Sequence, residues 1–398
     1  MKLFGILLGA ITGITTAQEL GGPASPASQA TTYLNLVRVG NKVTAQFDNS
    51  FKLLLDNPYV RPAPNRDSFE YWGFDAVNPN NINESVVVMF YLAHNLSLPH
   101  RTTASLVSVD VWLNFGDGTS APVVMDAQPD FRGIATVTIA PLMILGDWDS
   151  TGAAFTGTIS AMDGRSLYEI NIDNPEAGLR GTLRLQSEGP PHLPCTSNLT
   201  KTDASLEAIS HVGWTNEVPD ADAVATFSLN SSLTGNVEKT LQFTGGFGYH
   251  DHLFGDVPLR KSVKDWYSGH ARFGPYSVVW LKIISWDGKG QFNFQLSRNG
   301  RDLFTTCSKF NSSSATLPTD GDWKIVNDWY EADKVGMEIQ TVELDRVSAM
   351  TFNIYKTKLV ASNKEMSAWT GNVVTVTETE VTYRGAGMLM QHHFERPE

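Results

Sequence analysis

Two histidines flank an aspartate in the segment TGGFGYHDHLFGD, residues 244–256. Side chains two residues apart on a β-strand point to the same side, so His250 and His252 could bind one metal ion together. Zinc would need a third ligand and usually a fourth, and the other histidines of the chain are scattered. The alternative is a pair of histidines held by hydrogen bonds to neighbouring groups. We expect this second role and predict no metal site.

Aromatic residues gather around acids and a histidine in two other segments, SFEYWGFDAV (68–77) and DWYSGHARFGPYSVVW (265–280). A single tryptophan or tyrosine in such a run usually belongs to the core. The clustering of Trp, Tyr and His with Gly nevertheless indicates a ligand cavity. The sequence contains no G-x-S-x-G, H-E-x-x-H or Cys-x-x-Cys pattern and no phosphate loop. We therefore expect neither hydrolase, zinc-protease nor nucleotide-dependent chemistry, and no cofactor.

The composition is that of a globular protein. Of the 398 residues, 41% are hydrophobic and 18% are charged, which is enough apolar sequence for two cores. The net charge is −12 and no long basic run occurs. These features argue against nucleic acids and anionic membrane surfaces as partners.

The N-terminus predicts a secretory signal peptide. In MKLFGILLGAITGITTAQ, Lys2 precedes an apolar stretch, and small residues surround a cleavage site after Ala17. No other segment is apolar over the roughly 18 residues of a membrane span. We therefore expect the mature protein in the secretory pathway, as a glycoprotein. The candidate glycosylation sites are Asn83, Asn95, Asn198, Asn230 and Asn311. Cys195 and Cys307 could pair in that compartment or remain buried thiols.

The elements that position the candidate site residues are mostly strands, because runs rich in β-branched and aromatic residues dominate the sequence. Turn signals such as Asp287-Gly288 and Asn299-Gly300 separate the runs, and convincing helical periodicity is almost absent. A Pro/Gly-rich stretch, residues 187–194, resembles a linker. The sequence therefore predicts an all-β protein with two β-domains, each a β-sandwich or lipocalin-like barrel, and a ligand cavity between them. The predicted domains are residues 18–200 and 201–398, after a signal peptide at residues 1–17.

Four segments in this order carry a family resemblance: FEYWGFDAV, GYHDHLFG, WYSGHARFGPYSVVW and YRGAGM. The chain resembles the two-domain, lipocalin-like carotenoid 1,2-hydratase family over essentially its whole mature length. Within that family it is most similar to the fungal Diels–Alderases that form decalins. It departs from the family's usual motifs at Gly73, which removes a side chain, and at Leu253-Phe254, where the family has Asn and Trp. These departures weaken the expectation of water addition.

The resemblance implies an intramolecular [4+2] cycloaddition of a linear polyenyl tetramic acid, supplied by a polyketide synthase–peptide synthetase pathway. Such a reaction can be accelerated by confining the polyene and by donating a hydrogen bond to its carbonyl. We assign catalytic roles to Tyr71, Trp72, Tyr267 and Trp369. We assign substrate binding to Asn83, Tyr249, His250, His252, Phe254, Trp266, Lys356 and Arg384, with the two cations facing the tetramate anion. Asn83 also lies in a glycosylation triplet, and both roles cannot hold.

Two other functions are compatible with the sequence. A terpenoid or carotenoid hydratase or isomerase would need a proton donor with a shifted pKa near the cavity. A non-catalytic lipocalin-like carrier would bind the polyene without changing its rate of cyclisation.

Overall fold

The structure is a computed structural model of the whole chain. It describes residues 29–34, 44–47, 56–98, 101, 105–126, 134–192, 206–230, 235, 237–311, 323–327, 337–341, 350–362, 365–377 and 382–396. The predicted signal peptide, Cys195 and Asn198 lie outside these residues. Cys307 is disulfide-bonded, and the sequence contains only one other cysteine.

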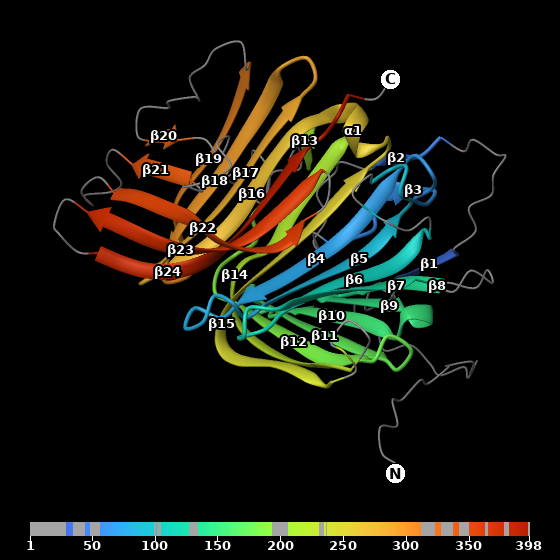
Figure 1. The fold of residues 1–398 in the computed structure, drawn as a ribbon. Helices are drawn as coiled ribbons and strands as arrows, with labels where there is room; N and C mark the ends of the chain where they lie inside the picture. Colours follow the sequence, from blue (N-terminus) through green and yellow to red (C-terminus); the bar gives the residue numbers. More distant parts are fainter. Residues whose placement is uncertain are drawn as a thin grey trace, which may run out of the picture.

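The first sheet has 13 strands, all antiparallel to their neighbours, and occupies the lower right of Figure 1. Its order is β1-β8-β9-β10-β11-β12-β14-β15-β4-β5-β6-β7, with β13 paired to β14. The strands are β1 (Gln29–Leu34), β4 (Phe69–Val77), β5 (Ser85–Ala93), β6 (Val107–Asn114), β7 (Ser120–Asp126), β8 (Ile134–Ala140), β9 (Met143–Trp148), β10 (Ala153–Ile159), β11 (Ser166–Asn174), β12 (Leu179–Ser187), β13 (Glu207–Ile209), β14 (Val212–Leu229) and β15 (Lys239–Gly255).

The second sheet has nine strands in the order β19-β18-β17-β16-β24-β23-β22-β21-β20 and lies at the upper left of Figure 1. Its strands are β16 (Val263–Phe273), β17 (Tyr276–Ser285), β18 (Lys289–Arg298), β19 (Arg301–Asn311), β20 (Trp323–Asn327), β21 (Met337–Thr341), β22 (Met350–Ser362), β23 (Met366–Thr377) and β24 (Thr382–His393). Two short strands, β2 (Gln46–Phe47) and β3 (Val60–Arg61), form a separate two-stranded sheet. The described helices are the short η1 (Asp149–Thr151) and α1 (Leu259–Ser262).

The predicted all-β class is confirmed. The two sheets do not, however, divide the chain at residue 200. β14 and β15 follow the predicted linker but pair with β12 and β4, so they belong to the first sheet. The chain enters the second sheet only after α1.

The burial of each strand follows from what covers its faces. β12 alternates between buried and exposed residues because solvent covers one of its faces, whereas all nine residues of β4 are buried. One face of β4 contributes Trp72, Phe74 and Ala76 to a core inside the first sheet. The other face contributes Phe69 and Tyr71 to a second core that also contains residues of β16, β17 and β24. This second core joins the two sheets.

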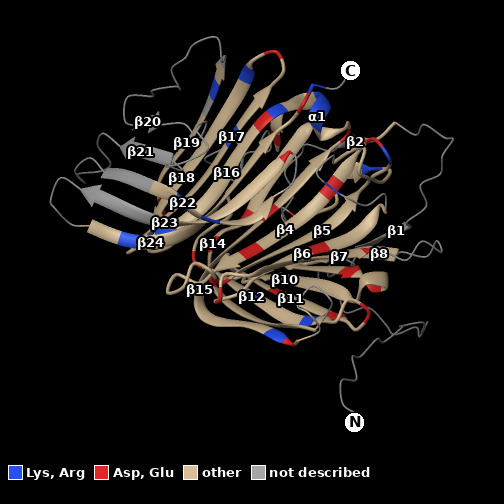
Figure 2. Cartoon of the chain, viewed as in Figure 1, with Lys and Arg blue, Asp and Glu red and all other residues tan. Residues whose placement is uncertain are grey.

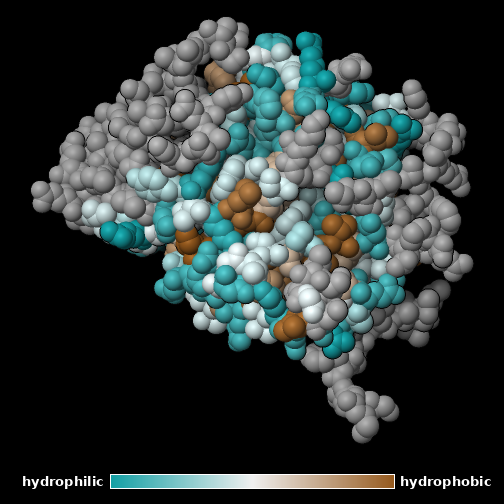
Figure 3. Space-filling view, in the orientation of Figure 1, coloured by the Kyte–Doolittle hydropathy of each residue, from teal (hydrophilic) through white to brown (hydrophobic). Residues whose placement is uncertain are grey.

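Charge is distributed unevenly over the molecule. Figure 2 shows acidic positions within the central strands, β4 among them, and basic positions in α1 near the edge. The face shown in Figure 3 is mainly hydrophilic, with separate hydrophobic spots. None of the helices in the described part of the chain has the length and apolar character that a membrane crossing requires.

Candidate active site

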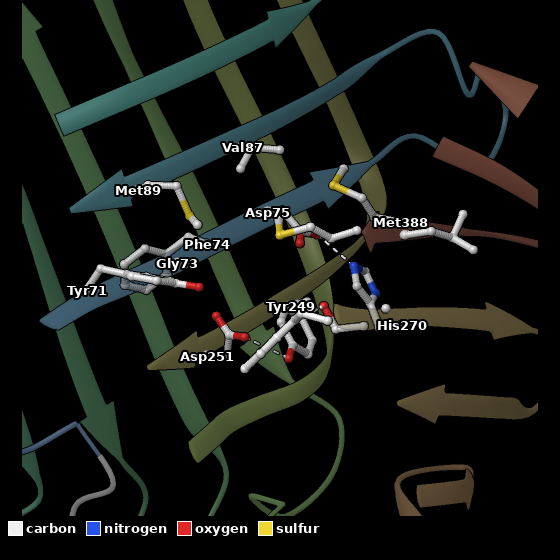
Figure 4. Close-up of a pocket in the computed structure, with 15 residues that line it drawn as sticks. Tyr71, Gly73, Phe74, Asp75, Val87, Met89, Tyr249, Asp251, His270 and Met388 are labelled. Carbon is white, nitrogen blue, oxygen red and sulfur yellow. Dashed lines mark hydrogen bonds and ion pairs between the residues drawn. The ribbon is translucent and has the colours of Figure 1, made fainter. Parts of the chain in front are cut away.

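A cavity lies where the two sheets meet (Figure 4). It contains about 470 Å³ of unfilled space, including the part open to solvent. β4, β5 and β15 of the first sheet form one wall, and β16 and β24 of the second sheet form the other. The lining residues are Tyr71, Gly73, Phe74, Asp75, Val87, Met89, Tyr249, Asp251, Trp266, Ser268, Gly269, His270, Met388, Leu389 and Met390.

Strand alternation in β15 separates the residues of the YHDH motif. Tyr249 and Asp251 line the cavity, whereas His250 and His252 lie on the opposite face of the strand and are fully buried. The predicted hydrogen-bonding role of these histidines therefore holds, but neither lines this cavity. The residue between them reaches the cavity instead.

The two histidines are paired with buried carboxylates. His250 Nε2 lies 2.8 Å from Asp56 Oδ2, and His252 Nε2 lies 3.0 Å from Glu70 Oε1. Burial alone would lower the pKa of His250, but the charge and hydrogen bond of Asp56 outweigh it and raise that pKa. The Tyr168 hydroxyl also donates to Asp56. Among the described residues, no group of His, Cys, Asp and Glu has the arrangement of a metal site.

Asp251 presents one carboxyl oxygen to the cavity, and neighbouring side chains hold the other oxygen by hydrogen bonds. Trp214 Nε1 donates to Oδ2 at 2.9 Å, and the Tyr249 hydroxyl donates to the same oxygen at 3.1 Å. The second oxygen points toward Gly73 and Tyr71 in Figure 4. A Cβ atom added to Gly73 would lie only 2.9 Å from Oδ1, so the absence of a side chain at residue 73 leaves room for this oxygen.

Burial raises the pKa of Asp251 from its ordinary value of 3.8 to about 6. The two hydrogen bonds and the charge of His250 lower the pKa, but they do not overcome the loss of water. A carboxyl group with this pKa can give up and take back a proton near neutral pH. Asp251 was not among the residues selected from the sequence. Its signal was present in the YHDH motif, where the alternation of faces can place it opposite the histidines.

Tyr71 offers a second donor on the same wall. Its side chain is buried, and its hydroxyl has no hydrogen-bond partner in the described part of the chain. Burial and the nearby charge of Asp251 raise its pKa well above the ordinary value, so the phenol keeps its proton. Trp266 lies on the opposite wall and donates from Nε1 to Ser268 Oγ at 3.0 Å. Tyr71, Tyr249 and Trp266 are thus the predicted site residues that the structure brings together.

His270 and Asp75 connect the two walls of the cavity. His270 Nε2 in β16 lies 2.7 Å from Asp75 Oδ1 in β4. Both residues lie in the aromatic segments 68–77 and 265–280, but neither was predicted from the sequence as a site residue. Their partnership spans 195 positions of the chain, so no local pattern could indicate it.

Four of the predicted residues do not line the cavity: Trp72, Phe254 and Tyr267 lie on the opposite faces of its strands, and Trp369 lies on the neighbouring strand β23. Trp72 follows Tyr71 and stacks on the His252 ring with a 4.4 Å centroid distance. Phe254 stacks on Tyr59. Tyr267 and Trp369 lie in or against the core of the second sheet.

The two predicted cations do not line the cavity either. Lys356 Nζ lies 4.2 Å from the Trp369 ring centroid and donates to Gln391, and Arg384 is exposed. Asn83 is half-buried in a loop between β4 and β5, where its backbone carbonyl accepts a hydrogen bond from Lys358. The structure thus places Lys356 with Trp369, whereas the cavity has no basic residue other than His270 among its described lining residues.

Sequence comparison decides the family. The family model described as Diels-Alderase-like matches residues 57–379, which is most of the chain. The chain belongs to the Diels-Alderase-like family. This confirms the predicted resemblance to Diels–Alderases, and the matched range includes every cavity residue of β4, β5, β15 and β16.

Curated relatives of this Diels-Alderase-like chain have two kinds of name. It is 33% identical over 253 residues to the quinolone epoxide rearrangement protein asqO of Emericella nidulans, covering 64% of each chain. It is 35% identical over 253 residues to the quinolone epoxide rearrangement protein penF of Penicillium thymicola, covering 64% of this chain and 66% of that protein. The matches therefore span slightly less than two thirds of either relative. A match to the Diels-Alderase cheD of Chaetomium globosum is 24% identical and covers 44% of this chain and 40% of cheD.

Among solved structures, the crystal structure of CghA with Sch210972 is similar to this Diels-Alderase-like chain with a TM-score of 0.62. The match covers 83% of this chain and 90% of CghA at 17% identity, so it supports the fold alone.

Proposed function

We propose that this protein is an enzyme that rearranges or cyclises a neutral small molecule, with Asp251 as the proton donor. The observation that supports this most is the arrangement of the Asp251 carboxyl group. Its Oδ2 already accepts two hydrogen bonds, so a proton on this group belongs on Oδ1, the oxygen on the side of Gly73 and Tyr71. A raised pKa of about 6 makes the protonated form accessible under physiological conditions.

An epoxide is the substrate group that fits this arrangement best. The proposed reaction begins when Asp251 Oδ1 gives its proton to the epoxide oxygen while one C–O bond breaks. Tyr71, whose hydroxyl has no partner among the described residues, would hold the same oxygen by a second hydrogen bond. The resulting electron-poor carbon is quenched by migration of a neighbouring group or by loss of a proton. The product is an isomer of the substrate, and Asp251 regains a proton before the next turnover.

The charge of the cavity favours a neutral substrate. Its described lining contains the carboxyl groups of Asp75 and Asp251 and neither lysine nor arginine. An ionised tetramic acid would meet two groups that carry or can acquire negative charge, without a compensating cation. A quinolone is neutral and has both a hydrogen-bond donor and an acceptor. The names of asqO and penF include this ring system and an epoxide, and we transfer that substrate class to this protein as part of the proposal.

A [4+2] cycloaddition is the second candidate, favoured by the family and by the apolar side chains that share the cavity with Tyr71. Val87, Met89, Trp266 and Met388 could fold a polyene, and the Tyr71 hydroxyl could polarise its carbonyl. The finer form of this candidate is decalin formation from a linear polyenyl tetramic acid. That form needs a cation for the tetramate, and Lys356 and Arg384 do not line the cavity.

Two substrates separate the candidates. The purified protein is incubated with a quinolone that carries an epoxide and, separately, with a linear polyenyl tetramic acid, and products are identified by chromatography with mass spectrometry and NMR. Our proposal predicts an isomeric product from the epoxide and loss of this activity in Asp251→Asn. Cyclisation of the polyene that persists in Asp251→Asn, with no reaction of the epoxide, would replace it by the cycloaddition.

A further inference from the structure

We propose that His270 is the general base of this cavity and that Asp75 positions it. The inference rests on the proposed function, because a rearrangement started by protonation must end with the removal of a proton. A base held near the acid, but separate from it, can remove this proton from a different position of the substrate than the oxygen that Asp251 has protonated.

His270 is held in place by two side chains. Its Nε2 lies 2.7 Å from Asp75 Oδ1, and its ring stacks on Tyr249 with a 4.8 Å centroid distance and an interplanar angle of 6°. Figure 4 shows the histidine and Asp75 joined across the space between the two sheets. His270 is 3% exposed and Asp75 is 9% exposed, so water competes little with their hydrogen bond.

The hydrogen bond selects which ring nitrogen can act. An ionised Asp75 can only accept, so Nε2 of a neutral imidazole must carry the proton and Nδ1 the lone pair. In the described part of the chain, His270 Nδ1 has no hydrogen-bond partner. This nitrogen is also not fully buried, so it remains accessible. A carboxylate that fixes the tautomer of a histidine in this way is the arrangement that prepares a general base.

Tyr249 links the base to the acid. One face of its ring supports His270, while its hydroxyl donates to Asp251 Oδ2 at 3.1 Å. The imidazole and the Asp251 carboxyl group therefore lie around the same tyrosine, with one contributed by each sheet. Neither sheet alone contains both groups, so the acid and the base come together only where the two sheets pack against each other.

The proton balance of the reaction is complete with these groups. Asp251 Oδ1 protonates the epoxide oxygen and one C–O bond breaks. His270 Nδ1 then removes a proton, either from a carbon beside the cation, whose C–H electron pair becomes a C=C bond, or from the hydroxyl group after a neighbouring hydride migrates. The second route gives a carbonyl group. In both routes solvent carries the proton from His270 back to Asp251, and no electron is gained or lost overall.

The first test needs no substrate. Protein with ¹⁵N-labelled histidine is examined by long-range ¹H–¹⁵N correlation NMR near pH 8, and His270→Gln assigns the signal. We expect His270 to be neutral with its proton on Nε2, and Asp75→Asn to weaken that preference. A proton on Nδ1, or an imidazolium that persists at this pH, would overturn the inference whatever the substrate is.

The second test uses the quinolone epoxide. We expect Asp75→Asn and His270→Ala to lower kcat by roughly a hundredfold or more with a smaller change in KM, and added imidazole to restore part of the activity of His270→Ala. The matched control is Asp256→Asn, which removes the carboxylate 2.9 Å from the exposed His211 outside the cavity and should leave kcat unchanged. Full activity in His270→Ala would contradict the role of His270. Failure of the unsubstituted protein to convert the epoxide would contradict the proposed function instead, and the NMR result would still decide the tautomer.

Discussion

Replacing Asp251 with asparagine removes a charge from the cavity but keeps an oxygen that can accept the hydrogen bonds of Trp214 and Tyr249. Burial raises the pKa of Asp251 from 3.8 to about 6, which means that the folded protein binds this proton more tightly than the unfolded chain does. One pKa unit corresponds to about 1.4 kcal/mol, so keeping the ionised carboxylate in the fold costs about 3 kcal/mol.

The sign of the effect depends on pH. Below the unfolded pKa of 3.8 the group is protonated in both states and costs nothing, and between there and about 6 the unfolded state loses its proton first. The free energy of unfolding of the wild-type protein therefore falls over this range because of Asp251, and the full cost remains at higher pH. Asparagine carries no charge at any of these pH values, so Asp251→Asn avoids the cost of burying a carboxylate. We expect the variant to be more stable than the wild type by up to about 3 kcal/mol near pH 8 and nearly equal below about pH 4.

Urea unfolding followed by tryptophan fluorescence near pH 4 and near pH 8 measures this difference. The matched control is Asp173→Asn, whose carboxylate is 71% exposed beside Arg180 and whose loss should change the stability by less than about 1 kcal/mol at either pH. An Asp251→Asn variant that is less stable than the wild type near pH 8, or equally stable at both pH values, would refute the idea that Asp251 is held in the cavity at an energetic cost.

Three further predictions concern other parts of the molecule. Gly73→Ala should lower kcat for the epoxide roughly a hundredfold, because the new Cβ would lie 2.9 Å from both Asp251 Oδ1 and Met89 Sδ, and Gly73→Ala with Met89→Ala should recover part of it; an unchanged rate in Gly73→Ala would contradict the cavity geometry. Asp56→Ala should lower the free energy of unfolding by about 3–5 kcal/mol, since it leaves buried His250 without its carboxylate, and a loss below 1 kcal/mol in urea unfolding would contradict this. If the chain enters the secretory pathway, as its N-terminus predicts, exposed Asn230 should carry a glycan; an endoglycosidase mobility shift that persists undiminished in Asn230→Gln would exclude that site.

The fold class was predictable because the signals for strands and turns are local. Runs such as SVVVMFY, residues 85–91, became strand β5, and the Asn299-Gly300 turn joins β18 to β19. The assignment of β14 and β15 was less accessible. Both follow a linker-like stretch in the sequence, but hydrogen bonds to β12 and β4 return them to the first sheet. Pairing between distant strands leaves no local pattern.

The candidate site was predictable only as a set of segments. Tyr71 and Trp72 are adjacent in the sequence, and both are buried, so hydrophobicity cannot tell which faces the cavity. A strand covered on both faces loses the alternation that would reveal its orientation, and a register change of one residue exchanges the two faces. For the same reason, the sequence could not show that Asp251, rather than His250 and His252, faces the cavity. The structure resolves these positions because it fixes the register of β15 against β4.

The dependence of the reaction rate on pH, in the wild type and in Asp251→Asn, tests most directly whether Asp251 is the acid. The measurement is kcat/KM for the quinolone epoxide across the range in which the protein remains folded. Our account predicts that the wild-type rate falls as the pH rises through about 6, because Asp251 loses the proton that it must donate. It also predicts that Asp251→Asn is slower by roughly a hundredfold or more and lacks this decline. An Asp251→Asn variant with the wild-type rate and the same decline would show that another group supplies the proton.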